Sequence, residues 1–224
     1  MPTPLVLLSG AGLPAWMWDE VRDQISTESR VAEYPRGDAG LTDYAAAALA
    51  AADGWDSFGI VAHSLGGVVG TEVVAQTPDR VVGFLGVAAA TPAAGGSFLG
   101  ALPFPQRHVV SLMMRLSGTR PPAKSIRRLC AGIATEQADR IVAEFAPESR
   151  RVYRDRVSAR EFPVTRAYVL TERDREFPEK LQERYAAQLG GPVHRLATAH
   201  LPMLEQPNAL ATVIAGTFGP TQAS

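Results

Sequence analysis

The sequence predicts an α/β domain with a mostly parallel sheet of about six strands, helices on both faces and an inserted helical cap. Three observations lead to this fold class. Short apolar runs without polar alternation are typical of strands buried on both faces, these runs alternate with helical segments, and the alternation is interrupted once. A length of 224 residues fits one such domain with a sizeable core.

The first 90 residues contain four of the expected strands and three of the expected helices. The strands are expected at Leu5–Leu8, Arg30–Tyr34, Ser57–His63 and Arg80–Ala89. The helices are expected at about Trp16–Ile25, Leu41–Ala52 and Leu65–Gln76. Thr42 or Asp43 can cap the start of the second helix, and Gly54 is placed to stop it.

The alternation breaks between residues 91 and 162, where proline and glycine punctuate two or three helical stretches. These stretches are expected around Arg107–Leu116, Ala123–Cys130 and Glu136–Phe145. We interpret residues 91–162 as a helical cap inserted into a core that comprises residues 1–90 and 163–224. The rest of the core is expected as strands at Thr165–Thr171 and Val193–Ala197 and helices at Pro178–Leu189 and Met203–Thr217.

Composition excludes several classes of protein. A formal net charge of -1, from 22 basic and 23 acidic residues, gives no electrostatic reason to expect nucleic acid as a partner. A single cysteine, Cys130, excludes an internal disulfide and suits a reducing compartment. The start of the chain lacks the pattern of a secretion signal, and apolar stretches such as Val81–Ala90 are too short to span a bilayer. We therefore expect a cytoplasmic protein with no membrane partner.

Ser64 is the candidate nucleophile. It lies in Ala62-His63-Ser64-Leu65-Gly66, between an expected strand and an expected helix, where a sharp turn can lift the side chain clear of the sheet. Such a turn crowds the positions two before and two after the serine, which must therefore be small. The usual pattern is G-x-S-x-G, and Ala62 departs from it by one methyl group.

His200 is the candidate base that would activate Ser64. It follows the last expected strand and should emerge at the same sheet edge as the serine. The other three histidines fit this role less well. His63 adjoins the serine but should point to the opposite face of its strand, His108 is in the cap, and His194 starts a strand. For His63 and His194 we expect ordinary packing or a surface position.

The acid that would orient His200 should follow the preceding strand, where Glu172, Asp174 and Glu176 occur close together. Asp174 is our choice. Glu172 is still close to the strand end, and Glu176 is close to the next helix, where a carboxylate also favours the helix dipole. The order serine, acid, histidine is the one that this type of turn requires.

Backbone N–H groups are the usual donors to a developing oxyanion. One candidate is the amide of Leu65, at the start of the helix after Ser64. The other is the amide of Ala11, because the run Gly10-Ala11-Gly12 allows a close approach after the first strand.

Four stretches of the chain resemble the methyl-salicylate esterase and hydroxynitrile lyase group of α/β-hydrolases over nearly the full length. They are Leu7–Ala11 with Ala15–Trp18, Ala62–Gly67, Tyr168–Pro178 and Ala199–Leu204. The resemblance implies the α/β-hydrolase fold, a catalytic triad of Ser64, Asp174 and His200, and an oxyanion hole from the amides of Ala11 and Leu65. Ser9 departs from the family, which usually has histidine there to help hold the oxyanion loop. Trp16 and Trp18 are expected to pack the first helix.

Within this group, two positions distinguish esterases from lyases. Lyases carry a lysine after the histidine and a threonine in the opening loop, and this chain has Leu201 and Gly10 there. We therefore expect a serine esterase that forms an acyl-enzyme on Ser64, acts on a small to medium, apolar or aromatic ester, and needs no cofactor or metal. The alternatives are a lactone or thioester hydrolase, a hydroxynitrile lyase and a non-hydrolytic ligand-binding or biosynthetic helper. Relatives often dimerise, so a homodimer is a further option.

Two groups of cap residues bear on the substrate. The apolar group could line a pocket or simply attach the cap to the sheet, and comprises Phe98, Leu99, Leu102, Phe104, Leu112, Met113, Met114 and Leu116. The basic group could attract an anionic substrate or an acidic carrier protein, although a solvated helix face is the simpler interpretation. It comprises Arg107, Arg115, Arg120, Lys124, Arg127 and Arg128.

Overall fold

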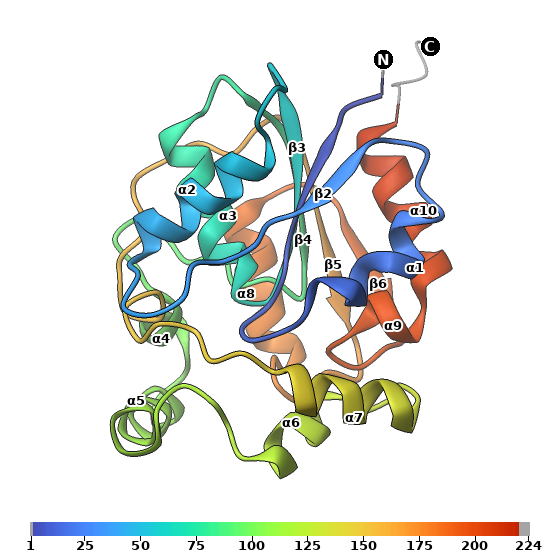
Figure 1. The fold of residues 1–224 in the computed structure, drawn as a ribbon. Coiled ribbons are helices and arrows are strands. Elements are labelled where there is room, and N and C mark those ends of the chain that lie inside the picture. The colour runs from blue at the N-terminus through green and yellow to red at the C-terminus, as the bar shows by residue number, and fades with distance from the viewer. Residues whose placement is uncertain (1, 220–224) are drawn as a thin grey trace.

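A computed structural model describes residues 2–219, and one six-stranded sheet runs through its centre (Figure 1). The strands are β1 (Leu5–Leu8), β2 (Ser29–Val31), β3 (Phe58–His63), β4 (Val81–Val87), β5 (Thr165–Thr171) and β6 (Val193–Leu196). Their order in the sheet is β2-β1-β3-β4-β5-β6, and every neighbouring pair is parallel. The predicted fold class is therefore confirmed, with a sheet that is wholly parallel.

Helices cover both faces of this sheet (Figure 1). One face is covered by α2 (Leu41–Ala51), α3 (Gly66–Gln76) and α8 (Glu179–Leu189). The other is covered by the 3-10 turn η1 (Ala15–Trp18), α1 (Asp19–Arg22), α9 (Pro202–Glu205) and α10 (Pro207–Phe218).

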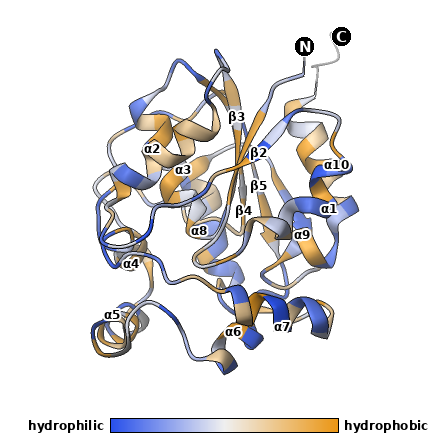
Figure 2. Cartoon of the chain, viewed as in Figure 1, coloured by the Kyte–Doolittle hydropathy of each residue, from blue (hydrophilic) through white to orange (hydrophobic). Residues whose placement is uncertain are grey.

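The strand β1 shows why the strands read as unbroken apolar runs. Val6 and Leu8 belong to the core cluster on the face of α2, α3 and α8, whereas Leu5 and Leu7 belong to the cluster on the opposite face. Successive side chains of a strand point to opposite faces, so a sheet covered on both sides needs apolar residues at every position. Figure 2 shows the same pattern, with hydrophobic residues concentrated in the strands and in α2 and α3.

The segment between β4 and β5 lies beyond the carboxyl ends of the strands (Figure 1). Its helices are α4 (Phe98–Ala101), α5 (Gln106–Ser117), α6 (Ala123–Leu129) and α7 (Thr135–Glu144). Three of them match predicted helical stretches, whereas α4 was not predicted because it has only four residues. The division of the chain into a core and a cap, with limits at 91 and 162, stays a prediction.

Two predicted helices were wrong in extent. The first was expected to be continuous to Ile25, but Gln24 donates to the carbonyl of Val21 in a three-residue turn that ends α1 at Arg22. The last was expected as one helix, but Pro207 has no N–H to donate, and α10 begins there as a separate helix after α9.

The start of α2 also differs from the expectation. Its N-cap is Gly40, and neither Thr42 nor Asp43 occupies that position. Asp43 instead lies three residues on, where its carboxylate accepts the Gly40 N–H at 2.7 Å. This carboxylate therefore stabilises the first turn from within the helix.

Candidate active site

Ser64 occupies a sharp turn between β3 and α3. Its φ of +52° is in the left-handed region, which costs free energy in a non-glycine residue. A Cβ on Gly66 would lie 2.5 Å from the carbonyl oxygen of Leu8, so only glycine fits two residues after the serine. Ala62, two residues before it, is fully buried. The small residues that motivated the sequence prediction are thus required by close packing.

Asp174 and His200 form a buried pair at the ends of β5 and β6. The Oδ2 atom of Asp174 lies 2.6 Å from Nδ1 of His200. The other carboxylate oxygen accepts the backbone N–H groups of Glu176 and Phe177 at 2.8 and 2.9 Å. Burial alone would raise the pKa of Asp174, but the charge and hydrogen bond of His200 and these two N–H groups outweigh it and lower the pKa. The carboxylate is therefore ionised at neutral pH and holds the imidazole ring.

Ser64, Asp174 and His200 all follow the carboxyl ends of parallel strands, as the sequence predicted. Their exposed fractions are 8%, 7% and 3%, so the site lies beneath the surface. Both His108 and His194 are exposed.

His63 has a role that the sequence analysis missed. Its Nε2 lies 2.8 Å from the backbone carbonyl oxygen of His200, and the two rings lie 4.8 Å apart. Since a carbonyl oxygen only accepts, Nε2 must carry the proton, which leaves Nδ1 as a buried acceptor beside Gly10. Burial and the nearby His200 lower the pKa of His63 to about 3, so the ring stays neutral. The only signal in the sequence is that His63 adjoins Ser64.

Glu205 joins the two loops that carry Asp174 and His200, and the sequence analysis missed it as well. Its carboxylate accepts the N–H of Ala199 at 2.7 Å and pairs with Arg173. The Glu205 side chain is only 9% exposed, so solvent screens its hydrogen bond to the Ala199 N–H little. The available signal was a carboxylate in the first turn of the helix after the histidine loop.

Ser9, which stands where the family usually has histidine, is held in the loop after β1 by two hydrogen bonds. Its hydroxyl accepts the Nε1–H of the fully buried Trp18 at 3.1 Å, and its carbonyl accepts the Tyr34 hydroxyl at 3.1 Å. A Cβ on Gly10 would lie 3.0 Å from Cβ of Ser64, so this loop packs directly against the serine. The Ala11 amide follows immediately in the same loop.

The two tryptophans differ in environment. Trp18 packs in the core beside α1, as expected. Trp16 is only partly buried, and its Nε1–H donates to Glu144 on α7 at 2.7 Å while Arg140 lies over its ring. Trp16 therefore connects the first turn to the segment between β4 and β5, besides packing at the edge of the core.

The sequence matches the model of the alpha/beta hydrolase family over residues 5–213. The chain belongs to this family. No curated protein sequence matches it.

Several solved structures share the fold of this alpha/beta hydrolase. An extracellular alpha/beta-hydrolase from a Paenibacillus species, described as sharing structural and functional homology with tobacco salicylic acid binding protein 2, has a TM-score of 0.82 and 18% identity. That match covers 98% of this chain and 100% of the other. A pyrethroid hydrolase from Sphingobium faniae has a TM-score of 0.74 and 20% identity, covering 99% of each chain. Polyneuridine aldehyde esterase has a TM-score of 0.75 and 17% identity, covering 96% of this chain and 99% of the other.

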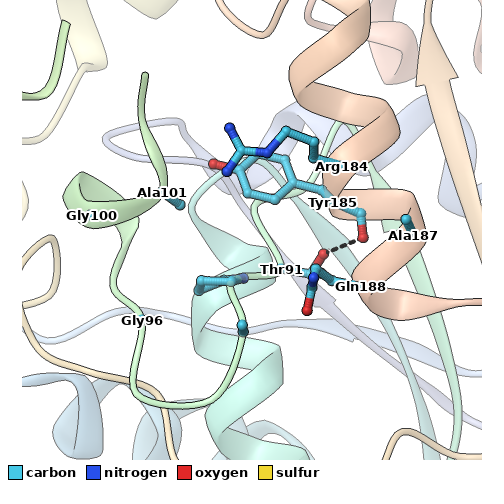
Figure 3. Close-up of a pocket in the computed structure, with 10 residues that line it drawn as sticks. Thr91, Gly96, Gly100, Ala101, Arg184, Tyr185, Ala187 and Gln188 are labelled. Atoms are coloured by element: carbon cyan, nitrogen blue, oxygen red, sulfur yellow. Dashed lines mark hydrogen bonds between the residues drawn. The ribbon is translucent and has the colours of Figure 1, made fainter. Parts of the chain in front are cut away.

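A cavity of about 330 Å³ lies between α8 and the segment that follows β4 (Figure 3). Thr91 and Tyr185 line it, and the Thr91 hydroxyl donates to the Tyr185 carbonyl at 2.8 Å. The Tyr185 ring packs on Phe177, which packs on His200, with centroid distances of 5.7 and 5.3 Å. Two aromatic rings therefore separate this cavity from the imidazole, and Ser64 does not line it.

The apolar residues between β4 and β5 divide into two sets. Leu99, Leu102 and Met114 are buried and attach the segment to the core. Four side chains of the same group are exposed, namely Phe104, Leu112, Met113 and Leu116. These four side chains therefore do not attach the segment to the core.

Three of the six basic residues in this segment bond to groups on other elements, whereas Arg107 contacts the nearby His108 and Phe104. Arg120 donates to backbone carbonyls near the end of α7, Arg127 pairs with Asp139, and Arg128 pairs with Glu176. These contacts indicate that Arg120, Arg127 and Arg128 hold the segment together and to the core.

Two structural features are absent from residues 2–219. These residues contain no group of three or more His, Cys, Asp or Glu side chains placed to hold a metal ion. None of the helices in that range has the length and apolar character needed to cross a bilayer.

Proposed function

We propose that this alpha/beta hydrolase is a serine esterase that cleaves a small to medium, apolar or aromatic carboxylic ester. The observation that carries the proposal is the 2.6 Å contact between Asp174 Oδ2 and His200 Nδ1, at the same edge of the sheet as a serine held at φ +52°. An acid that fixes one tautomer of a histidine beside a serine on such a turn is the arrangement that activates a hydroxyl for acyl transfer.

The first half of the reaction forms an acyl-enzyme. Asp174 keeps the proton on Nδ1 of His200, so Nε2 can take the proton from the Ser64 hydroxyl as Oγ bonds to the ester carbonyl carbon. The N–H groups of Ala11 and Leu65 stabilise the negative oxygen that forms. When this intermediate collapses, the ester C–O bond breaks and His200 returns the proton to the departing alcohol.

The second half releases the acid. Water loses a proton to Nε2 of His200 and attacks the acyl carbon, and the bond to Ser64 Oγ then breaks as the serine regains its proton. The net reaction consumes one ester and one water and yields one alcohol and one carboxylic acid. It uses only side chains and backbone groups of this chain.

The preference for an apolar or aromatic substrate is supported by rings beside the base. Phe177 contacts His200, Phe98 lies 6.0 Å from Phe177, and Tyr153 lies 5.4 Å from Phe98. These rings extend from the imidazole toward the segment between β4 and β5, and such surfaces favour apolar ligands. The pyrethroid hydrolase and polyneuridine aldehyde esterase among the structural neighbours are, by their names, hydrolases.

Cleavage of cyanohydrins is disfavoured by two residues of the site. Leu201 stands where lyases of the group carry lysine. A side chain at position 10, where the lyases carry threonine, would lie 2.9 Å from Nδ1 of His63. The buried Leu201 cannot supply a charge for a departing cyanide.

Activity-based labelling tests the proposal. Wild-type protein should react with a fluorophosphonate probe and hydrolyse p-nitrophenyl acetate, and Ser64→Ala should lose the label and about a million-fold in turnover. Ser26→Ala, which changes an exposed serine, is the matched control and should retain both. A wild-type protein that neither labels nor hydrolyses short esters, thioesters or lactones would favour the ligand-binding helper. Preference for a thioester or lactone over the ester would assign the same triad to that bond.

Location and assembly stay predictions. The cytoplasmic expectation has no support from the Paenibacillus neighbour, which is extracellular. A homodimer is to be tested by the sedimentation of the purified protein.

A further inference from the structure

Residues 145–149, which follow α7, contact the loop that carries Ala11, and we call them the docking segment. The N–H of Ala146 donates to the carbonyl of Gly12 at 3.0 Å. The N–H of Gly12 donates to Oε1 of Glu148 at 2.9 Å. Both backbone polar groups of the residue after Ala11 are therefore bonded to the docking segment.

Gly12 is shaped for this contact. Its φ is +71°, and a Cβ would lie 2.3 Å from the ring of Phe145, the first residue of the docking segment. Any larger residue would push the segment off the loop. The contact thus combines two hydrogen bonds with an aromatic ring seated on a bare Cα.

The carboxylate of Glu148 is itself fixed on both oxygens. The Tyr44 hydroxyl, from α2, donates to Oε2 at 2.6 Å and accepts the N–H of Ser149 at 3.0 Å. Burial and the hydrogen bond to Glu148 raise the pKa of Tyr44, so its hydroxyl stays a donor. Glu148 is 8% exposed, and a buried carboxylate persists only when such donors satisfy it.

Packing alone does not hold this loop in place. A cavity of about 560 Å³ borders it and is lined in part by Ser9, Gly12 and Glu148. Because the loop borders this cavity, the hydrogen bonds to Ser9 and Gly12 contribute to its position. A shift of about 1 Å in a positioned group can cost about 100-fold in rate.

We propose that Glu148 is a positioning residue that keeps the Ala11 N–H aimed at the oxyanion of the reaction. The oxyanion hole is then complete only when the docking segment is seated on Gly12. The segment between β4 and β5 thereby contributes to transition-state stabilisation. This inference rests on the proposed esterase function.

Three variants of the full-length protein separate positioning from simple stabilisation. Glu148→Ala removes both acceptors, whereas Glu148→Gln keeps an oxygen for the Gly12 N–H. Glu72→Ala removes another buried carboxylate, which is 7% exposed and bonds to Ser158 instead of Gly12, and is the matched control for lost stability. Glu148→Asp keeps the charge but withdraws it by one methylene, and replaces Glu148→Ala if that variant fails to fold.

The first measurement is hydrogen–deuterium exchange of residues 9–14, which does not depend on activity. The second is kcat/KM for p-nitrophenyl acetate with the inhibition constant of an aryl trifluoromethyl ketone, which forms an oxyanion on a reactive serine. For Glu148→Ala we expect faster exchange, a 10- to 100-fold fall in kcat/KM and an equal loss of ketone affinity, on the order of one oxyanion donor. KM should change less than threefold, and Glu148→Gln and Glu72→Ala should stay within about threefold of wild type.

The two measurements give distinguishable failures. Unchanged exchange in Glu148→Ala would overturn the positioning role. Faster exchange with unchanged ketone affinity would overturn the link to the oxyanion, as would equal losses in Glu148→Ala and Glu72→Ala. A wild-type protein inert to esters and to the fluorophosphonate would overturn the esterase function and the oxyanion role together, while the exchange data would still decide whether Glu148 holds the loop.

Discussion

Nε2 of His63 lies 2.8 Å from the backbone carbonyl oxygen of His200, so the residue before the proposed nucleophile anchors the main chain of its proposed base. The two residues are 137 positions apart in the chain. One strand end therefore sets the position of both partners, Ser64 through the chain and His200 through this hydrogen bond.

Loss of this hydrogen bond should lower turnover. His63→Phe keeps an aromatic ring at this position but removes the Nε2–H donor. The buried carbonyl of His200 is then unpaired, at a cost of about 1–3 kcal/mol. We expect kcat to fall about tenfold or more in His63→Phe and less in His63→Gln, which keeps a donor. The measurement is kcat for p-nitrophenyl acetate alongside thermal unfolding. Wild-type kcat in His63→Phe would show that the anchor is dispensable.

The stability of the protein should decrease as pH falls below 6.5. Unfolded His63 takes up a proton near 6.5, whereas the pKa in the folded protein is about 3. Between these values the unfolded chain binds more protons, so the free energy of unfolding falls with pH by up to about 1.4 kcal/mol per unit. Asp174 adds to this slope only below about pH 5, because its unfolded pKa is 3.8 and its folded pKa is lower.

Urea unfolding of wild type, His63→Gln and His194→Gln between pH 7 and pH 4 measures this slope. His194 is exposed, so its variant should behave like wild type. The slope should be shallower in His63→Gln alone. Identical slopes in all three proteins would assign the acid sensitivity to other groups.

Replacement of Asp174 by asparagine should disable the base without unfolding the protein. The amide cannot hold the proton on Nδ1 of His200, and the equivalent change in a serine protease lowers kcat about 10⁴-fold through the wrong tautomer. We expect a similar fall in Asp174→Asn, measured by steady-state kinetics. Asp53→Asn, at an exposed position, should match wild type. A fall of less than tenfold in Asp174→Asn would point to another acid.

Ser9 and Trp18 should be energetically coupled. Ser9→Ala leaves a buried indole N–H without an acceptor, and Trp18→Phe removes the donor, so each destabilises the protein by about 1–3 kcal/mol. The double variant should be more stable than the sum of the single effects by about 1 kcal/mol. Denaturant unfolding of the four proteins gives this coupling energy. A value near zero would mean that the 3.1 Å contact contributes only packing.

The sequence predicted what depends on local pattern. The apolar runs located the inner strands, because burial on both faces leaves no polar position in a strand such as β1, whereas the edge strands β2 and β6 contain polar residues. The residue types around Ser64 could be recognised because a turn with φ +52° excludes large neighbours. Asp174 and His200 could then be chosen because each follows a strand whose carboxyl end lies at the same sheet edge as Ser64.

The contacts that support the site could not be predicted in the same way. Glu148, Glu205 and His63 each make one hydrogen bond to a backbone group. The type of the residue that carries this backbone group does not reveal the bond. The clearest case is Gly12, whose two partners are more than 130 positions away. Boundaries at α1 and α10 failed for a related reason, since one three-residue turn or one proline decides them.

The position of His200 after the final strand affects how the protein becomes active during synthesis. A growing chain that has reached the end of β4 already contains Ser64 and both proposed oxyanion amides, yet it lacks the residues that would make the hydroxyl reactive. Reactivity can begin only after β6 joins the edge of the sheet and brings His200 against Asp174. Nascent chains on ribosomes should therefore resist acylating agents until residue 200 has left the ribosome.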